Sequence, residues 1–374
     1  MRLFCQRIQV SRSPTSPSGK RFKNPDHFLA TWKDQNAKKP FCFWFGANDP
    51  HRGYKLNSGE KSGMDLSKIK LFEHYPDSPE IRGDVADYYF EVQRFDRELG
   101  QFLNKLKELG ALENTLVVVT GDHGMPFPRC KSNLYDSGAR VPLAIQWPKV
   151  IKKGRVINDF VSTTDLAPTF LEAAGLKPLA AMTGRSLMPI LQSSANGRIE
   201  PKIRNHVITG KERHVLAQEA PDTGGTPMRA IRTHQHLFIE NFRPDRWPAG
   251  TPHHEKATIR GAWLADCDNG PTKTYMVNHK DKDDEHRRKY DLSFAKRPAY
   301  ELYDLKKDPA QLHNIADSTE YEAVLKELRW KLHGVLKATQ DPRIAGKGAK
   351  TFDQPKYLGG APKFPKAKKT PTRK

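Results

Sequence analysis

The chain has 374 residues, enough for a full hydrophobic core and, at usual domain sizes, about two structural units. Its formal net charge of +20 suits a partner with negative charge, such as nucleic acid, an anionic surface or a sulfated or phosphorylated sugar. Lys and Arg are spread diffusely, so a solvated basic surface explains this charge equally well. No apolar run reaches the roughly 18 residues of a membrane-spanning helix, and we expect no membrane partner.

The beginning of the chain has no clear secondary-structure pattern. Residues 1–25 are basic and rich in Ser and Pro, and we expect them to be irregular. They lack the apolar stretch of a signal peptide, so either the protein is not exported or its natural start lies elsewhere. The four cysteines match neither a zinc-binding spacing nor a dense disulfide framework, which leaves the redox compartment open.

The first half of the chain alternates between strand and helix patterns. We predict a short helix over residues 27–36 and a buried strand over residues 39–46. Apolar residues at three- and four-residue steps predict a long helix over residues 81–109, with Gly110 as its C-cap. The run LVVVT at residues 116–120 predicts another fully buried strand. Strand, long helix and strand in succession predict a βαβ unit whose two strands are parallel.

Polar residues follow both of these strands directly. Asp122 and His123 come after the second strand, and His51 and Arg52 come after the first. Ligands of open α/β sheets bind beyond the carboxyl ends of the strands, so we expect these side chains to lie close together. Lys131 ends a proline-bracketed loop and could fold back over the same place as a fixed cation. Each residue taken singly is also an ordinary turn or surface residue.

The second half of the chain has a different pattern of predicted helices and strands. The expected elements are a strand at 141–147, a helix at 163–175 capped by Thr164 or Asp165, short antiparallel strands at 228–233 and 236–242, a strand at 301–305 and a helix at 318–339. We divide the chain into an irregular segment at 1–25, an α/β domain at 26–205, a smaller α+β domain at 206–344 and a disordered basic tail at 345–374. His214 could line a substrate cleft, whereas residues 280–288 are most simply solvated charge.

Three motifs in this order resemble the sulfatases, and the branch they resemble most is that of the heparan N-sulfatases. They are GANDPHR at 46–52, TGDHGMPFP at 120–128 and YELYDLKKDP at 300–309, with PMRA at 227–230 as further support. The resemblance covers residues 25–340 and implies an alkaline-phosphatase-like α/β domain followed by a smaller domain with an antiparallel sheet. It implies hydrolysis of sulfate esters or sulfamates of sulfated sugars, with no nucleic-acid partner. It also implies a periplasmic or secreted location for the full-length family member.

The resemblance also implies roles for single residues. Asp122 and His123 would be ligands of Ca²⁺, although an alternative role for His123 is a hydrogen bond to the sulfate or the nucleophile, because Ca²⁺ prefers oxygen. His51 would contact the sulfate and protonate the leaving atom, and Lys131 would bind the sulfate as a cation. Arg52 and His214 are our candidate substrate-binding residues.

One departure from the family pattern bears on activity. The family places a formylglycine, made from Cys or Ser, in a Cys/Ser-x-Pro-x-Arg signature, and no such signature occurs in the 374 residues. We therefore expect an α/β sheet that is incomplete at the N-terminus, a truncated or misassigned start, and no catalysis by the chain as written. Exposed apolar positions are then expected on the strand at 41–45 or its neighbours. The alternatives are a non-catalytic protein that binds sulfated glycans and a phosphodiesterase of the same superfamily.

Overall fold

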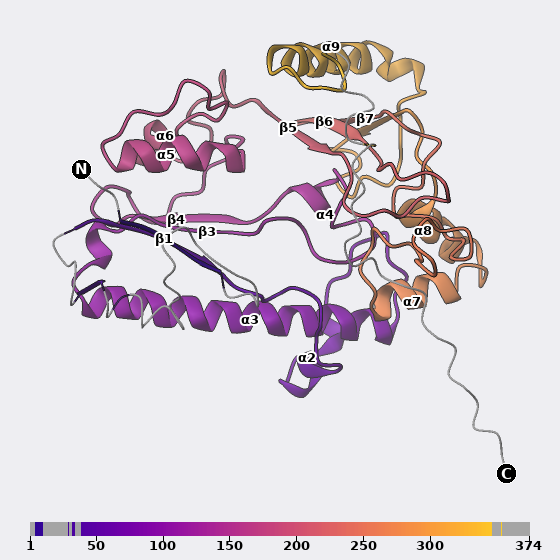
Figure 1. Ribbon diagram of the computed structural model, residues 1–374, viewed down its shortest axis with the longest axis horizontal. Coiled ribbons are helices and arrows are strands. Elements are labelled where there is room, and N and C mark those ends of the chain that lie inside the picture. The colour runs from indigo at the N-terminus through magenta and orange to yellow at the C-terminus, as the bar shows by residue number, and fades with distance from the viewer. Residues whose placement is uncertain (1–3, 10–28, 30–31, 34–38, 346–352, 354–374) are drawn as a thin grey trace.

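The computed structural model describes residues 4–9, 29, 32–33, 39–345 and 353, with the two ends of the described chain far apart (Figure 1). The predicted helix at 27–36, the predicted tail at 345–374 and most of the predicted irregular segment at 1–25 lie mainly outside these residues. None of the described helices combines the length and apolar character needed to cross a membrane.

The long helix α3, Pro79–Glu108, underlies the first half of the chain (Figure 1). Ser78 caps it by accepting a hydrogen bond from the amide of Ile81, and Pro79 occupies the first turn, where a missing N–H costs nothing. Gly110 follows the cap residue Leu109 of this helix, and its φ of +65° suits glycine just after a helix end. The helix predicted at 81–109 and its glycine C-cap are therefore confirmed.

Four strands lie above α3 in two separate pairs. They are β1, Phe4–Gln9, parallel to β2, Phe41–Gly46, and β3, Val117–Thr120, antiparallel to β4, Leu143–Gln146. Each predicted strand exists, but the two strands of the predicted βαβ unit are not hydrogen-bonded to each other, because β2 pairs with β1 and β3 with β4. The partner of β2 lies within the segment that we predicted to be irregular.

Strands β2 and β3 are only half-buried, in contrast to the fully buried strands predicted there. A two-stranded sheet leaves much of its surface without neighbours, and the Trp44 side chain is 64% exposed. The faces turned to α3 are better covered, because Phe43 stacks on Phe102 with ring centroids 5.3 Å apart and Val117 joins the same apolar cluster. On the opposite side the layer is covered by α5, Leu166–Ala173, and α6, Met188–Gln192 (Figure 1).

The predicted helix at 163–175 consists of a 3₁₀ turn, Thr163–Asp165, followed by α5. Ser162 begins the turn in a capping box with Asp165, which satisfies two amides that the turn would leave open. Asp165 was one of the two predicted caps, and it is also the residue before α5. Gly175 follows the helix with a φ of +73°.

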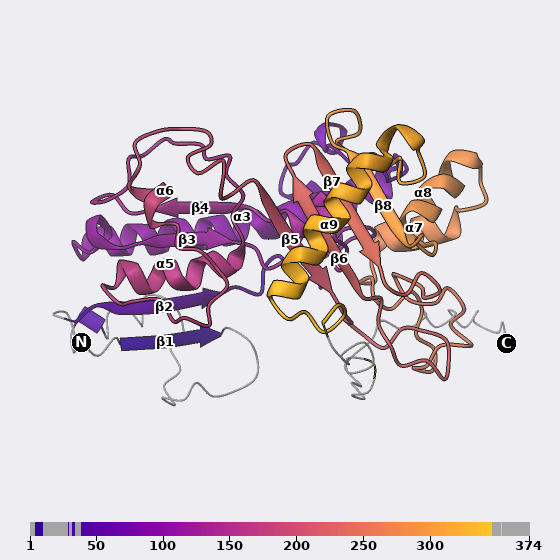
Figure 2. The ribbon, with the colours of Figure 1, turned by 90° about the horizontal axis from the view of Figure 1, so that it is seen from above.

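The second half of the chain is built on an antiparallel sheet (Figure 2). Its order is β5, His206–Lys211, β6, Met228–Thr233, β7, His236–Asn241, and β8, Tyr300–Asp304. Helix α9, Glu322–Ala338, covers one face, where Leu328 and Leu332 pack on apolar side chains of β6, β7 and β8. The predicted strands at 228–233, 236–242 and 301–305 and the closing helix are confirmed, whereas β5 was not predicted.

Two further helices return from this sheet to the first half of the chain. They are α7, Pro271–Asn278, and α8, Asp284–Phe294. The largest apolar cluster joins Ile81 and Val85 of α3 to Met276 of α7 and Phe294 of α8. Residues 280–288 are exposed apart from the half-buried Lys280 and His286, which confirms the prediction of solvated charge, and the buried residues of α8 begin at Lys289. One core spans the predicted boundary near residue 206.

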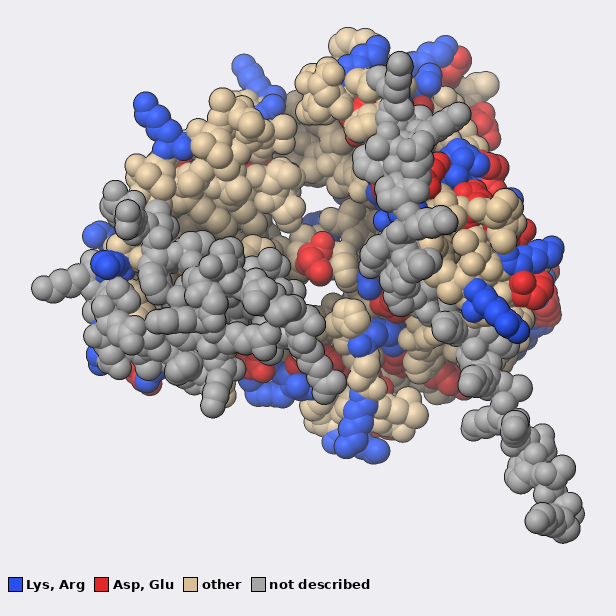
Figure 3. Space-filling model, viewed as in Figure 1, with Lys and Arg blue, Asp and Glu red and all other residues tan. Residues whose placement is uncertain are grey.

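Short elements complete the fold and position the loops between the sheets. They are α2, Ser58–Lys61, α4, Asp136–Ala139, and 3₁₀ turns at Leu66–Lys68, Leu112–Asn114 and Thr319–Tyr321. On the face seen in Figure 3, basic side chains are interspersed with acidic ones and do not gather in one patch. A diffuse basic surface, weighed above against a dedicated anion-binding patch, fits this face.

Candidate active site

The loop after β2 is a tight polar turn that exposes an imidazole. The amide of His51 donates to the Asn48 carbonyl at 2.7 Å, and the Tyr54 hydroxyl donates to the Pro50 carbonyl at 2.9 Å. The ring of His51 is exposed, with Nδ1 3.0 Å from the Arg52 carbonyl oxygen. An Nδ1–H donating to that carbonyl leaves Nε2 directed away from the backbone and open to a ligand.

Arg52, a predicted substrate-binding residue, is held inside the protein. Its guanidinium donates two hydrogen bonds to the Asp84 carboxylate, at 2.7 and 2.8 Å, and a third to the Pro126 carbonyl at 3.0 Å. The same group lies 4.5 Å from the centroid of the Phe127 ring. Burial opposes its charge, but the hydrogen bonds and charge of Asp84 raise the pKa of Arg52. Arg52 therefore joins the loop after β2 to the loop after β3, and a contact with substrate stays a prediction.

The loop after β3 carries Asp122 and His123 at its open end. The side chain of Asp122 is 90% exposed, and in the described part of the chain its one charged partner is His123, with Nε2 3.7 Å from Oδ1. His123 is turned back, its Nδ1 lying 2.7 Å from the Gly124 carbonyl oxygen.

Gly124 allows the next part of this loop to lie against the backbone of α4. A Cβ at this position would lie 2.0 Å from the Ser137 carbonyl oxygen, closer than any side chain tolerates. The Gly124 amide donates to the Gly138 carbonyl at 2.8 Å, and the Lys131 amide donates back to the Met125 carbonyl at 3.0 Å. The loop thus folds back on itself.

The Lys131 side chain is largely buried and its ammonium group is paired. Its side chain is 12% exposed, and its Nζ donates to Oδ2 of Asp268 at 3.1 Å. Asp268 belongs to the loop at 262–270, in which the sequence analysis identified no functional residue. Gly270, at the end of this loop, packs on Arg52, since a Cβ at Gly270 would lie 2.4 Å from Cζ of Arg52.

A buried ammonium organises the loop at 262–270. Nζ of Lys273, on α7, donates to the carbonyls of Trp263, Leu264 and Cys267 at 2.8–2.9 Å and to Oδ1 of Asn269 at 3.0 Å. The side chain is fully buried, and this burial lowers the pKa of Lys273 to about 8. A polar cluster followed by a lysine (DCDNGPTK at 266–273) was the only local signal of this arrangement.

His214, the remaining predicted site residue, is attached to the same loop. Its Nδ1 lies 2.7 Å from Oδ1 of Asp266, and Oδ2 of that carboxylate accepts a hydrogen bond from Lys211. Asp266 is 7% exposed, whereas the His214 ring is 38% exposed. The imidazole therefore has a buried, anchored edge and an open edge.

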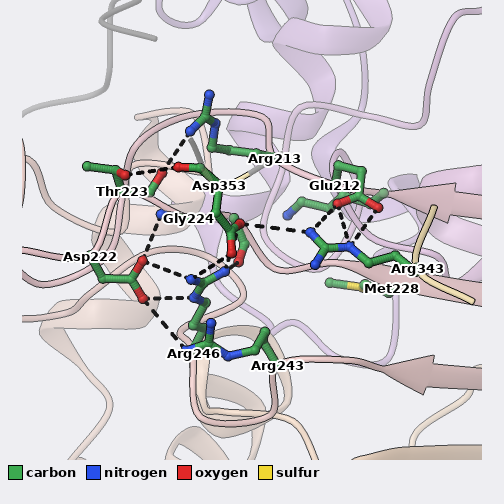
Figure 4. Close-up of polar contacts among 12 residues, drawn as sticks. Glu212, Arg213, Asp222, Thr223, Gly224, Met228, Arg243, Arg246, Arg343 and Asp353 are labelled. Atoms are coloured by element: carbon green, nitrogen blue, oxygen red, sulfur yellow. Dashed lines mark hydrogen bonds and ion pairs between the residues drawn. The ribbon is translucent and has the colours of Figure 1, made fainter. Parts of the chain in front are cut away.

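The strand that delivers His214 is fixed from its other side by an ionic network (Figure 4). Glu212 accepts hydrogen bonds from Arg229 at 2.6 Å and from Arg343, also at 2.6 Å at its shortest. Arg246 of the same network binds Asp222 and Asp353. Arg229 belongs to the PMRA motif, and its place in this network makes the contribution of that motif structural.

The residues described around Asp122 do not by themselves form a metal site. Within the described part of the chain, no three His, Cys, Asp or Glu side chains gather where they could hold a metal ion. Ca²⁺ takes six to eight oxygen ligands. Asp122 and His123 supply at most two or three donor atoms, so the residues described here do not make a complete calcium site.

Part of this chain matches a known protein family. The Sulfatase family model matches residues 22–176. Curated sulfatases also match this chain over 85% of its length, so the chain is similar to the sulfatase family beyond these residues. The fold class predicted from the motifs, alkaline-phosphatase-like with an added antiparallel sheet, is confirmed.

Two curated relatives and one solved structure set the scale of the similarity. An ulvan-active sulfatase of Formosa agariphila is 28% identical over 85% of this chain and 58% of its own length. The N-sulphoglucosamine sulphohydrolase of Homo sapiens is 29% identical over 85% of this chain and 64% of its own length. A protein solved with its substrate D-glucosamine-2-N,6-O-disulfate has a TM-score of 0.57 and 19% identity over 85% of this chain and 69% of its own. The chain thus spans about three fifths of the length of these two curated relatives.

Proposed function

We propose that this chain forms the sulfate-recognising part of a sulfatase that hydrolyses sulfate esters or sulfamates of sulfated sugars. The supporting observation is that the loops bearing His51, Lys131 and His214 are tied to one another through the loop at 262–270 and through Arg52. Two imidazoles and one ammonium on connected loops are suited to hold a sulfate group and a proton.

Each residue has a definite part in this function. Lys131 binds sulfate oxygens as a point charge, because its ammonium is compact and carries three donors. His51 donates a hydrogen bond from Nε2 to the sulfate or protonates the leaving oxygen or nitrogen. His214 contacts the sugar through its open ring edge. Arg52 acts at a distance, by joining the loop of His51 to that of Lys131.

In the proposed function Asp122 is the residue that would bind Ca²⁺, and His123 lies beside it. A carboxylate is a ligand that Ca²⁺ prefers, but the donors described do not complete a coordination shell, so we derive no step through the ion. The sequence also has no Cys/Ser-x-Pro-x-Arg signature from which a formylglycine nucleophile could form. We therefore propose that these 374 residues bind sulfated sugars without turning them over.

The probe follows from the chemistry of the relatives. One relative is named for N-sulphoglucosamine, and another protein of similar fold was solved with a glucosamine disulfate. A net charge of +20 favours a substrate that carries several sulfates. We propose sulfated glucosamine, N-sulfated or O-sulfated, as the substrate class.

Calorimetric titration with D-glucosamine-2-N,6-O-disulfate tests this function. We expect binding that weakens with salt, that is lost in Lys131→Ala and that is unchanged in Lys326→Ala, which removes an exposed lysine of α9. No binding by the wild-type chain would overturn the proposal. Sulfate release should be assayed with the product of the complete reading frame. Binding without release would then favour the non-catalytic glycan-binding protein, and release of phosphate from an aryl phosphodiester would favour the phosphodiesterase.

A further inference from the structure

The loop at 262–270 touches three candidate site residues, Arg52, Lys131 and His214, yet it supplies no group to the function proposed above. It is built around the fully buried Lys273 ammonium, which donates to three of its carbonyls and to the Asn269 side chain. A cation with four acceptors fixes the backbone of a loop that has no regular secondary structure. The two carboxylates that leave this loop, Asp266 and Asp268, are consequently held in place.

Asp268 fixes the ammonium of Lys131. The two side chains are 12% and 19% exposed, and Nζ lies 3.1 Å from Oδ2. A free lysine side chain has four rotatable bonds and loses on the order of 2 kcal/mol of conformational entropy when it is held in one place. A lysine already held by Asp268 has lost this entropy before a ligand arrives.

Asp266 fixes the tautomer of His214. Its carboxylate only accepts hydrogen bonds, so Nδ1 of His214, 2.7 Å away, carries a proton, and Nε2 of the neutral ring is an acceptor. The second oxygen of Asp266 accepts from Lys211, whose Nζ also donates to the Pro248 carbonyl at 3.3 Å. With both oxygens engaged, the carboxylate cannot rotate away from the imidazole.

We infer, building on the function proposed above, that Asp266 and Asp268 are positioning residues: Asp268 aims the Lys131 ammonium at the sulfate, and Asp266 holds His214 as the Nδ1–H tautomer that presents Nε2 to the sugar. The loop at 262–270 thus positions both His214, which contacts the sugar, and Lys131, which binds the sulfate. A sugar hydroxyl or ammonium group that donates a hydrogen bond is the partner for Nε2 of His214.

The tautomer of His214 can be measured without any ligand. In Asp266→Asn the Lys211 ammonium can only donate, so the amide oxygen must face Lys211 and the NH₂ must face His214. Nδ1 then becomes the acceptor and the proton moves to Nε2. Ring ¹⁵N shifts at pH 8, assigned with His214→Gln, should show the Nδ1–H form in the wild type and the Nε2–H form in Asp266→Asn.

A double variant is the matched control for this exchange. Adding Lys211→Met to Asp266→Asn removes the donor that fixed the amide, so its oxygen can turn to His214 and restore the Nδ1–H form. A wild-type ring in the Nε2–H form, or a single variant that keeps the Nδ1–H form, would overturn the role of Asp266. These outcomes do not depend on whether the chain binds sulfated sugars.

Variants at Asp268 separate positioning from charge. Asp268→Asn keeps an oxygen that accepts from Lys131, whereas Asp268→Ala loses both the hydrogen bond and the charge. We expect Asp268→Ala to weaken binding of D-glucosamine-2-N,6-O-disulfate about ten-fold and Asp268→Asn to remain within about three-fold of the wild type. If Asp268 only competes with the sulfate as a counter-charge, both variants bind more tightly, and the inference fails. Absence of binding by the wild type would instead overturn the proposed function.

Discussion

The Arg52 guanidinium and the Asp84 carboxylate form a two-bond ion pair, at 2.7 and 2.8 Å, between the loop after β2 and the second turn of α3. Asp84 is 2% exposed and also accepts hydrogen bonds from the amide and hydroxyl of Thr272, at the start of α7. One carboxylate therefore holds together the loop of His51, the long helix and the helix that follows the loop at 262–270. The site loops converge at this point of the fold.

Asp84→Asn should be strongly destabilising, because it leaves the buried Arg52 charge without a full counter-charge. The expected loss in the free energy of unfolding is about 3 kcal/mol, measured by urea denaturation at pH 7. Asp77→Asn is the control, since it breaks the two-bond pair with Arg82 at a carboxylate that is 67% exposed, and should cost less than about 1 kcal/mol. Equal losses in the two variants would contradict a structural role for the Arg52–Asp84 pair.

The sequence predicts the strands and their polar ends because these are local patterns. An apolar run that stops at Gly121 and Asp122 identifies a strand end, and three- and four-residue spacing identifies α3. That spacing concerns apolar residues and gives no account of Asp84 and Asp87, both of which are 2% exposed. Their partners, Thr272 for one and the amides of 57–59 for the other, lie 28 to 188 residues away, where no local pattern reaches.

The strand pairing and the burial of Lys273 could not be predicted from the sequence for the same reason. A run such as residues 41–46 indicates a strand but does not indicate which other strand it pairs with. In the structure β2 pairs with β1 and not with β3. Lys273 resembles any solvated lysine in the sequence, and only the folded loop around it supplies the acceptors that make burial of its charge tolerable. The positions of Asp266 and Asp268 depend on that loop. The sequence therefore could not predict that these carboxylates contact His214 and Lys131.

Lys273→Met should destabilise the protein and should do so in a pH-dependent way. At pH 7 the variant leaves three carbonyls and one amide oxygen without their donor, at a total cost above about 3 kcal/mol. Burial lowers the pKa of Lys273 to about 8, below the roughly 10.4 of an unfolded lysine, so between these values the unfolded chain binds more protons and stability rises with pH. The stability difference between wild type and variant should therefore grow from pH 8 to pH 10.

The measurement is a series of urea titrations of wild type and Lys273→Met across that pH range. Lys326→Met, which removes an exposed lysine of α9, should stay within about 0.5 kcal/mol of the wild type throughout. A difference between wild type and Lys273→Met that stays constant or shrinks from pH 8 to pH 10 would show that the buried amine keeps an ordinary pKa.

His74 should make the protein sensitive to acid. Its side chain is 3% exposed, and burial, with the charge of Arg129 adding to it, lowers the pKa of His74 well below its usual value. As pH falls below about 6.5, the unfolded chain takes up a proton that the folded chain refuses, so stability falls by up to about 1.4 kcal/mol per pH unit. His74→Gln should remove this part of the pH dependence, as measured by thermal unfolding from pH 7 to pH 5. His253→Gln, at an exposed ring, should unfold with the wild-type dependence.

Calcium should bind this chain weakly and through Asp122. A single fully exposed carboxylate with one neighbouring imidazole supplies few of the six to eight oxygens that Ca²⁺ takes, so we expect a dissociation constant of about 1 mM or weaker. Titration calorimetry with CaCl₂ should detect this binding in the wild type and none in Asp122→Asn, while Asp65→Asn, at another exposed aspartate, should leave it unchanged. Micromolar binding would show that further oxygen ligands surround Asp122, and calcium binding that survives in Asp122→Asn would place the ion at another site.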